Sequence, residues 1–433
     1  MVSHPINEVL VNVHQTEDLL SSILVELIVM IGAARLMNTA LRRIGQPGVV
    51  GEIVAGLLLG PSFLGHFFPH AARVLFGGSA STPITIISQI GLVLLMFQIG
   101  MDFEFGHLEN RRNARSAFAV AIVSVSVPFA LGLLIGEWSA SALAPAINPW
   151  VYSLFVGVGL AITAVPILGR ILRQYGLTRT RVGVIAITAA AVNDVIGWIL
   201  LAGVSAFAAA RFSVGHVAWQ VAGLALLLVA LWYVLHPLVV WLLRTFPLRD
   251  GTIPPNLMAL SVILSFSVAI CTYKLGIFAI FGGFAAGLLF HRHEAFVDAW
   301  RRQAGQFVTV FFLPVFFTFT GLRTNVLGLT GADLAWLAAM LATAILGKML
   351  PVYWTGRIMG FGAAESWTLG ALMNTRALME LIVLNIGFDL GFIPQRVFTM
   401  LVIMAVVTTV MTGPLLSSLL PRIGHLSPAD ADA

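Results

Sequence analysis

Stretches of about 20 apolar residues recur along this chain, from Leu19 almost to its C-terminus. An α-helix rises 1.5 Å per residue, so a stretch of about 20 residues crosses the roughly 30 Å of hydrocarbon in a bilayer. Hydrophobic residues make up 59% of the sequence and charged residues 10%, whereas charged residues make up about 25% of an ordinary soluble domain. No water-soluble fold could bury so much apolar surface. The sequence therefore predicts an all-α membrane protein whose solvent is the lipid bilayer.

Joints that are charged or rich in Pro and Gly divide the chain into about thirteen expected transmembrane helices. These helices should begin near Leu19, Pro47, Pro83, Ser116, Trp150, Val182, Val214, Pro254, Gly276, Ala304, Ala332, Ala364 and Ile393. The alternate loops between them differ in Lys and Arg content, sixteen residues against five, and the richer loops are usually cytoplasmic. We therefore expect the N-terminus outside and the C-terminus in the cytoplasm. The location that we expect is the inner (plasma) membrane of a bacterium.

We expect all of these helices to form a single membrane domain. We expect an extracytoplasmic N-terminal segment at residues 1–18, a transmembrane domain at 19–421 and a short cytoplasmic tail at 422–433, with no cytosolic regulatory domain. The first segment has no basic region before an apolar stretch, so we expect no cleavable signal peptide.

Two short motifs recur in the two halves of the transmembrane domain. The second expected helix contains Ala55-Gly56-Leu57-Leu58, and the ninth contains Ala286-Gly287-Leu288-Leu289. The third ends in Gly100-Met101-Asp102, and the tenth ends in Gly321-Leu322-Arg323. Both pairs are seven helices apart, and an odd shift reverses the direction across the membrane, which predicts an inverted repeat. The repeats would cover about 19–210 and about 254–419, with a linker helix at about 214–245.

The fifth and twelfth expected helices correspond in this repeat, and polar or helix-breaking residues interrupt both. The interruptions are Thr163-Ala164-Val165-Pro166 in one helix and Asn374-Thr375, followed by Arg376, in the other. Proline removes an amide donor and clashes with the preceding turn, and backbone carbonyls freed inside a membrane need another partner. A packing kink would explain Pro166 taken singly. Two interruptions at matched positions favour a binding site near the bilayer midplane.

Asp194 lies near the expected centre of the bilayer. It is about twelve residues, or about 18 Å of helical rise, into the span that starts near Val182. A charged group there costs about 3 kcal/mol or more to insert and usually faces a cavity or a partner. With Asn193 as a neutral neighbour, Asp194 could exchange a proton for a cation. Membership of a structural ion pair is the alternative.

Lys348 is expected in the middle of another helix, with no acidic residue at helical spacing. Its charge partner should therefore come from elsewhere in the fold, and Asp194 is the natural candidate. Snorkelling or a purely structural role is the alternative.

Further charged and polar residues of the expected helices are candidates for gating or for structural support. Arg376 and Glu380 are four residues apart, which is about one helical turn, so they can neutralise each other. The others are Arg323, Gln98, Asp102 and Glu52, each of which could line an ion pathway or lie at an interface.

Several classes of function find no support in the sequence. An enzyme of this kind would need a nucleophile with its base, and neither Gly-x-Ser-x-Gly nor His-Glu-x-x-His occurs. The run His291-Arg292-His293-Glu294 matches no zinc spacing. The arginines lie in short loops rather than on one basic face, which argues against nucleic acid as a partner. We expect no catalytic residue, no cofactor and no metal beyond a transported monovalent cation.

The chain resembles the monovalent cation:proton antiporter superfamily, in the branch of the plant cation/proton exchangers and the bacterial potassium efflux antiporters. The resemblance, to a sodium/hydrogen exchanger domain, rests on Gly51–Pro61, Ala189–Val195, Gly321–Asn325 and Met373–Val383. It implies thirteen helices, a core domain with two crossed broken helices, a dimerisation domain, a homodimer and elevator-like movement of the core. It also implies that Asp194 binds the ion and carries the proton, with Asn193 beside it.

Three departures limit the resemblance. Some sodium/proton exchangers carry a glutamate where this chain has Ala189, and plant relatives often have Lys where it has Arg323. The cytosolic nucleotide-binding domains of the potassium efflux relatives have no counterpart here, so their gating should not be carried over.

The residues and the resemblance together predict a secondary active antiporter. It would exchange K⁺ or Na⁺ for H⁺ by alternating access, and the single carboxylate of Asp194 argues for electroneutral one-for-one exchange. A cation channel and a sodium-coupled solute symporter are the alternatives, although no filter-like repeat such as Thr-Val-Gly-Tyr-Gly occurs. The sequence does not choose between Na⁺ and K⁺.

Overall fold

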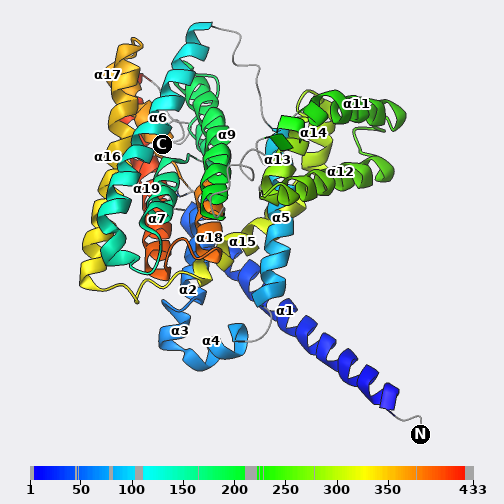
Figure 1. Cartoon of the computed structure of the whole chain (residues 1–433). Helices are drawn as coiled ribbons and strands as arrows, with labels where there is room; N and C mark the ends of the chain where they lie inside the picture. Colours follow the sequence, from blue (N-terminus) through cyan, green and yellow to red (C-terminus); the bar gives the residue numbers. More distant parts are fainter. Residues whose placement is uncertain are drawn as a thin grey trace.

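The structure, a computed structural model, is shown in Figure 1. It describes residues 4–43, 46, 48–77, 81–102, 111–163, 165–209, 222–223, 225–227, 229–276, 278–376 and 378–424. Every long regular element in these ranges is a helix. The chain therefore has the all-α architecture that its apolar stretches predict.

One set of helices contains both interrupted spans, and we call it the broken-helix group (left in Figure 1). Its buried apolar side chains form most of the largest hydrophobic cluster. It comprises α6 (Arg111–Leu143), α7 (Pro149–Ala161), α8 (Val165–Gln174), α9 (Arg181–Ala209), α16 (Gly331–Ile358), α17 (Ala363–Met373), α18 (Leu378–Asp389), α19 (Gln395–Leu419) and the short η5 (Leu420–Ile423).

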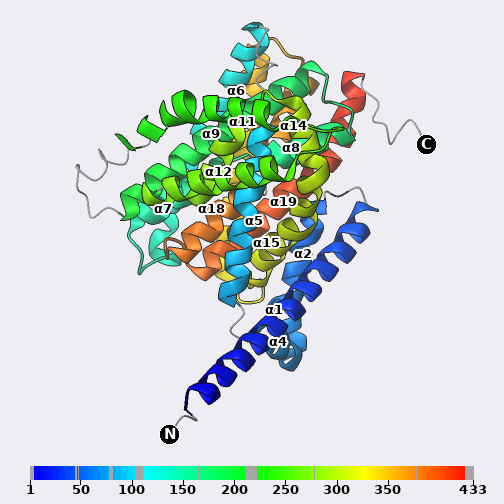
Figure 2. The same ribbon diagram turned by 90° about the vertical axis from the view of Figure 1, so that its right-hand side faces the viewer.

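The remaining helices form a second set, the scaffold group, which Figure 2 views from its outer side. The N-terminal part of α1 extends away from the other helices in both views. The scaffold group comprises α1 (His4–Arg42), α2 (Gly48–Leu59), α3 (Leu64–Phe67), α4 (Pro69–Phe76), α5 (Ser81–Met101), η2 (Leu231–Leu235), α11 (His236–Thr245), α12 (Pro255–Lys274), α13 (Ala279–Leu288), α14 (Glu294–Trp300), η3 (Arg301–Gly305), η4 (Val308–Phe312) and α15 (Leu313–Leu322).

The number of membrane-crossing helices is lower than expected within the described ranges. Ten helices are long and apolar enough to cross a bilayer, and a pair bent by 47° raises the total to eleven. The expected spans near Trp150 and Gly276 correspond to α7 and α13, which are shorter apolar helices. The expected start of the linker helix near Val214 lies outside the described residues. The count of thirteen therefore stays a prediction.

Both interrupted spans contain a real gap in the helix. α7 ends at Ala161 and α8 begins at Val165, while α17 ends at Met373 and α18 begins at Leu378. Pro166 is the second residue of α8, where a missing amide donor costs little. The first gap therefore lies before the proline, and Ala164 within it lies outside the described residues.

Local sequence signals fix the ends of two helices that carry the site. The Asn148 side chain accepts a hydrogen bond from the Trp150 amide, and Pro149 occupies the first turn of α7. At α16, Thr330 and Asp333 form a reciprocal capping box. These caps satisfy backbone donors that would otherwise have no partner at a helix start.

The glycines of the two recurring motifs contact each other across the scaffold group. A Cβ atom added to Gly56 would lie 2.8 Å from the Cα of Gly321, and one added to Gly287 would lie 3.0 Å from the Cα of Gly100. Gly56 therefore packs on Gly321, and Gly287 packs on Gly100. In each pair, the glycine of an Ala-Gly-Leu-Leu motif from one half of the chain contacts a glycine near the end of a helix from the other half. Only a residue without a side chain allows the two backbones to approach so closely.

We expect Gly56→Ala to lower the melting temperature, because the new methyl group would overlap backbone atoms that cannot move aside. Overpacking of this kind costs about 1–3 kcal/mol. Gly32→Ala in α1 is the matched control, since nothing lies within 4 Å of a Cβ added there. Thermal unfolding of both purified variants checks the prediction, and equal melting temperatures would contradict it.

Candidate functional site

Asp194 lies in the middle of α9 and is 2% exposed. Its carboxylate accepts a hydrogen bond from the backbone amide of Val165, the first residue of α8. A helix N-terminus carries free amide donors and a partial positive charge, so it favours an anion. The Oδ1 atom of Asp194 has no hydrogen-bond partner among the described residues. The gap in the helix thus fixes one side of the carboxylate and leaves the other side uncommitted.

Asn193 joins α9 to α6 and to the first gap. Its Nδ2 atom donates to Ser124 Oγ at 2.9 Å and to Thr163 Oγ1 at 3.3 Å. Thr163 in turn donates to the carbonyl of Met373 at 3.1 Å, so it also touches the end of α17. The Oδ1 atom of Asn193, like that of Asp194, has no partner within the described part of the chain.

These two unpartnered oxygens are the feature of the site that indicates a ligand. Buried polar atoms are normally paired, and a buried atom without a partner needs a chemical explanation. Oxygen atoms are the ligands that replace the hydration shell of an alkali cation inside a protein. One carboxylate oxygen and one amide oxygen on adjacent residues can therefore contribute to binding such a cation.

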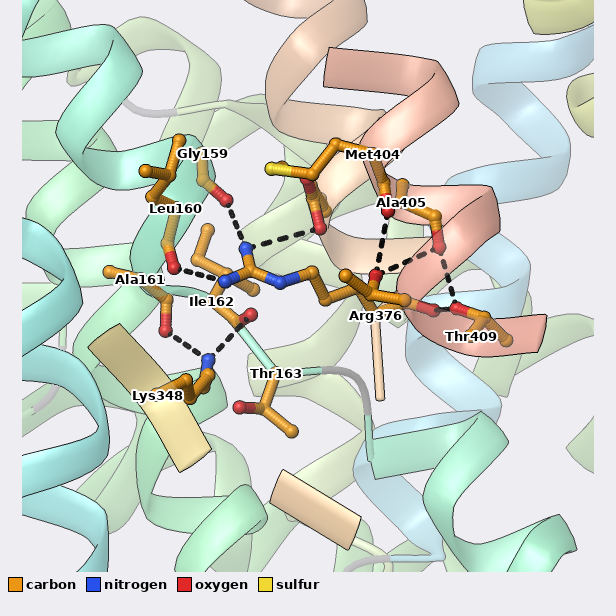
Figure 3. A network of polar contacts seen from close by, with 12 residues as sticks. Gly159, Leu160, Ala161, Ile162, Thr163, Lys348, Arg376, Met404, Ala405 and Thr409 are labelled. Carbon is orange, nitrogen blue, oxygen red and sulfur yellow. Dashed lines mark hydrogen bonds and ion pairs between the residues drawn. The ribbon is translucent and has the colours of Figure 1, made fainter. Parts of the chain in front are cut away.

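Two buried cations satisfy the carbonyls at the end of α7 (Figure 3). The last carbonyls of a helix lack partners within the helix and form the negative end of its dipole. Lys348 Nζ donates to Ala161 and Ile162 at 2.6 Å and 2.9 Å. The Arg376 guanidinium donates to the two preceding carbonyls, Gly159 at 2.8 Å and Leu160 at 2.5 Å. Four consecutive carbonyls are thus held by one side chain from α16 and one from the gap between α17 and α18.

The position of Lys348 differs from the sequence expectation of a direct pair with Asp194. Within the described residues, these two side chains form no ion pair, and the Lys348 ammonium group donates to backbone carbonyls instead. The reason lies in the first gap, whose two helix ends attract opposite charges. Its carbonyl end takes Lys348, while its amide end takes Asp194. The two charges still interact electrostatically across the gap.

The second gap is held by charges and hydroxyls. Arg376 lies inside it and forms an ion pair with Glu380 in the first turn of α18, at 3.5 Å. The Arg376 carbonyl accepts a hydrogen bond from Thr409 of α19. Asn374 donates to the Met411 sulfur at 3.6 Å, and the Thr375 and Thr412 hydroxyls are 3.4 Å apart. The second gap is therefore tied to α19, as the first is tied to α9.

The structure places the other candidate residues in the scaffold group rather than beside Asp194. Glu52 is buried on α2 and accepts from Asn38 at 3.3 Å. Asp102 pairs with Arg301 at 2.7 Å, and the Oε1 atom of Gln98 is buried without a described partner. Arg323, just after α15, pairs with Asp389 at the end of α18. None of these contacts involves Asp194.

Ser124 is a functional candidate that sequence reasoning missed. It is fully buried on α6 and holds the Asn193 amide. A small hydroxyl residue in an apolar helix is common and gives little signal by itself. Its role becomes visible only through the packing of α6 against α9.

Comparison with known proteins finds sequences that are similar to this one over most of the chain. Na(+)/H(+) antiporter NhaS4 of Synechocystis sp. is 35% identical over 408 residues, which cover 93% of this chain and 98% of that protein. Cation/H(+) antiporter 18 of Arabidopsis thaliana is 32% identical over 90% of this chain and 48% of that protein. K(+)/H(+) antiporter 1 of Saccharomyces cerevisiae is 28% identical over 87% of this chain and 44% of that protein. The chain thus spans about half the length of these plant and yeast relatives.

A solved structure has the same fold. The sodium proton antiporter MjNhaP1 from Methanocaldococcus jannaschii at pH 8 matches with a TM-score of 0.58 and 15% identity, covering 92% of this chain and 97% of that one. This likeness confirms the predicted all-α membrane fold, while the inverted repeat and the count of thirteen helices stay predictions. The sequence also matches the family described as "Sodium/hydrogen exchanger, transmembrane" over residues 27–421. Its relatives named above are antiporters rather than enzymes. The chain belongs to the transmembrane sodium/hydrogen exchanger family.

Proposed function

We propose that this protein is a secondary antiporter in which a monovalent cation and a proton compete for the carboxylate of Asp194. The observation that carries the proposal is the buried carboxylate at the first gap, with one oxygen committed to the α8 amide and the other without a described partner. The names of the relatives support it, since they are Na⁺/H⁺, K⁺/H⁺ and cation/H⁺ antiporters.

In this proposal the surrounding groups have separate tasks. Asp194 takes either the proton or the cation, and the oxygens of Asn193 and Thr163 complete the cation's surroundings. Lys348 and Arg376 stay on the carbonyls of α7 and keep the gap open in both loaded states. Because the proton and the cation carry the same charge, the two loaded states have the same net charge.

We extend the proposal to the architecture and its movement. The reciprocal contacts of Gly56 with Gly321 and of Gly100 with Gly287 are what two repeats of opposite orientation would produce. The broken-helix group would move as a unit against the scaffold group and expose Asp194 to each side in turn. We also propose a homodimer, with the N-terminus outside and the arginine-rich loops in the cytoplasm of a bacterial cell.

Ion flux in proteoliposomes tests the function directly. With a pH-sensitive dye inside, an antiporter changes the internal pH when Na⁺ or K⁺ is added outside, even after the membrane potential is set to zero. A channel would instead carry cation current without a coupled pH change, and a symporter would need a solute. Separate additions of Na⁺ and K⁺ identify the transported ion.

We expect the exchange rate to be insensitive to an imposed membrane potential, because one proton is exchanged for one monovalent cation at a single carboxylate. When Na⁺ is the transported ion, a potassium gradient with valinomycin imposes the potential. When K⁺ is the transported ion, a gradient of a lipophilic ion that carries no proton imposes the potential instead. A severalfold change of rate on reversing the potential would contradict one-for-one exchange.

A further inference from the structure

The hydrogen bonds that join the two helix groups gather around Arg323. The Arg323 guanidinium pairs with Asp389 and donates to Asn385 Oδ1 at 3.0 Å, both on α18. Asn385 in turn donates to Thr320 Oγ1 of α15 at 2.9 Å. The side chain of Arg323 therefore lies between the two groups with contacts to both.

Two more hydrogen bonds between the groups lie beside these. Gln395, at the start of α19, donates to the Arg323 carbonyl, and Thr399 of α19 accepts from the Asn325 amide at 3.2 Å. The guanidinium also lies over the rings of Phe319 and Phe388, at 5.2 Å and 4.8 Å from their centres. We call the set made of Thr320, Arg323, Asn325, Asn385, Asp389, Gln395 and Thr399 the Arg323 cluster.

A cavity lies between the groups at the same place. Arg323, Asn385 and Asp389 line it, together with Ser88 and Gln89 of α5. The second gap and the Arg323 cluster lie at opposite ends of α18. Leu378 and Asp389, which begin and end this helix, are eleven residues apart, or about 16 Å of helical rise. The cavity therefore lies along the boundary at which the groups would slide, and three residues of the cluster line it.

The charges of the cluster are suited to reversible contact. The side chain of Arg323 is 22% exposed and that of Asp389 is 40% exposed. Water can therefore reach both groups when they separate, so the cost of leaving a bare charge in a dry interior is avoided. A fully buried pair such as Arg376 with Glu380 would not have this property.

We propose that the Arg323 cluster is a latch that holds the broken-helix group against the scaffold group and closes this end of the molecule. Opening the latch hydrates the cavity and gives Asp194 access to this side of the membrane. The inference rests on the proposed function, because it assumes that the two groups move relative to each other during transport.

Thiol labelling tests the latch without using transport. The free Cys271 is first replaced by Ser, and Ser88→Cys is introduced as a reporter in the cavity wall. A water-soluble maleimide then labels the full-length protein in proteoliposomes. Arg323→Gln should raise the labelling rate about fivefold or more, which is the lower end of the range usual for coupling between two sites of one protein. The charge swap, Arg323→Asp with Asp389→Arg, should restore slow labelling.

Arg396→Gln is the matched control. Arg396 is an arginine at the same end of α19, but its hydrogen bonds go to Ala142 and Leu143 within the broken-helix group. Labelling should stay slow in this variant. Should Arg323→Gln not fold, Asp389→Asn removes the partner charge and carries the same expectation. Unchanged labelling in the Arg323 and Asp389 variants, or equal acceleration in Arg396→Gln, would overturn the latch.

The labelling result separates the latch from the proposed function. The same measurements in an Asp194→Asn background need no ion exchange, and the acceleration by Arg323→Gln should persist there. If the unmodified protein showed no ion exchange, the proposed antiporter function would be contradicted, but the labelling result would still stand. Normal flux with unchanged labelling would contradict the latch alone.

Discussion

Asp194→Asn is expected to abolish coupled exchange while leaving the protein folded. An amide can neither release the proton nor neutralise the cation, so both halves of the exchange are lost. The fold should survive because an Asn side chain can still accept the hydrogen bond from the Val165 amide at the start of α8. The measurement is cation-driven pH change in proteoliposomes, together with the melting temperature of the purified variant.

Asp298→Asn is the matched control for this substitution. Asp298 is an exposed carboxylate of the scaffold group, paired with Arg301 at 3.2 Å on the same stretch of helix. Exposed pairs of this kind contribute about 0–1 kcal/mol, so both exchange and stability should be close to those of the unmodified protein. Coupled exchange that survives in Asp194→Asn would remove Asp194 from the mechanism.

Lys348→Met is expected to lower stability strongly but to leave exchange qualitatively intact. The methionine keeps most of the apolar stem, yet the carbonyls of Ala161 and Ile162 lose their donor. Removing one partner from a buried charged contact typically costs about 3–5 kcal/mol. Because Lys348 binds these carbonyls rather than the carboxylate, Asp194 remains able to take a proton or a cation. Thermal unfolding and proteoliposome flux measure the two effects separately.

Lys274→Met controls for the loss of a lysine as such. Lys274 is the other lysine of the chain and is exposed at the end of α12. We expect its melting temperature and flux to be unchanged. A Lys348→Met protein as stable as the Lys274→Met protein would show that the carbonyl contacts do not stabilise the gap.

The sequence predicts the features that depend on one stretch of chain at a time. Membrane-spanning helices follow from hydropathy, and the family relation follows from residues such as Asn193 and Asp194. The helix interruptions lie where Thr163 and Asn374 indicate, because polar and helix-breaking residues act locally on the backbone. The number of membrane spans is harder to predict from hydropathy, because α7 and α13 are apolar but shorter than a full membrane-crossing helix.

The partners of the charged residues could not be predicted in the same way. The sequence predicts an ion pair between Lys348 and Asp194 because both carry charge, but the free carbonyls at the end of α7 compete for the same ammonium group. Such carbonyls have no signature in the sequence, since every residue has one. The partners of Arg323 are 62 and 66 residues away on α18. Their meeting depends on how the two helix groups pack, which no local pattern encodes.

The most direct test of the account asks whether the cation displaces the proton from Asp194. Purified protein in lightly buffered detergent solution is mixed with Na⁺, or separately with K⁺, at a series of pH values, and proton release is measured. We predict release of up to one proton for each cation bound, and no release from Asp194→Asn. Cation binding without proton release, or equal release from Asp194→Asn, would contradict a shared site.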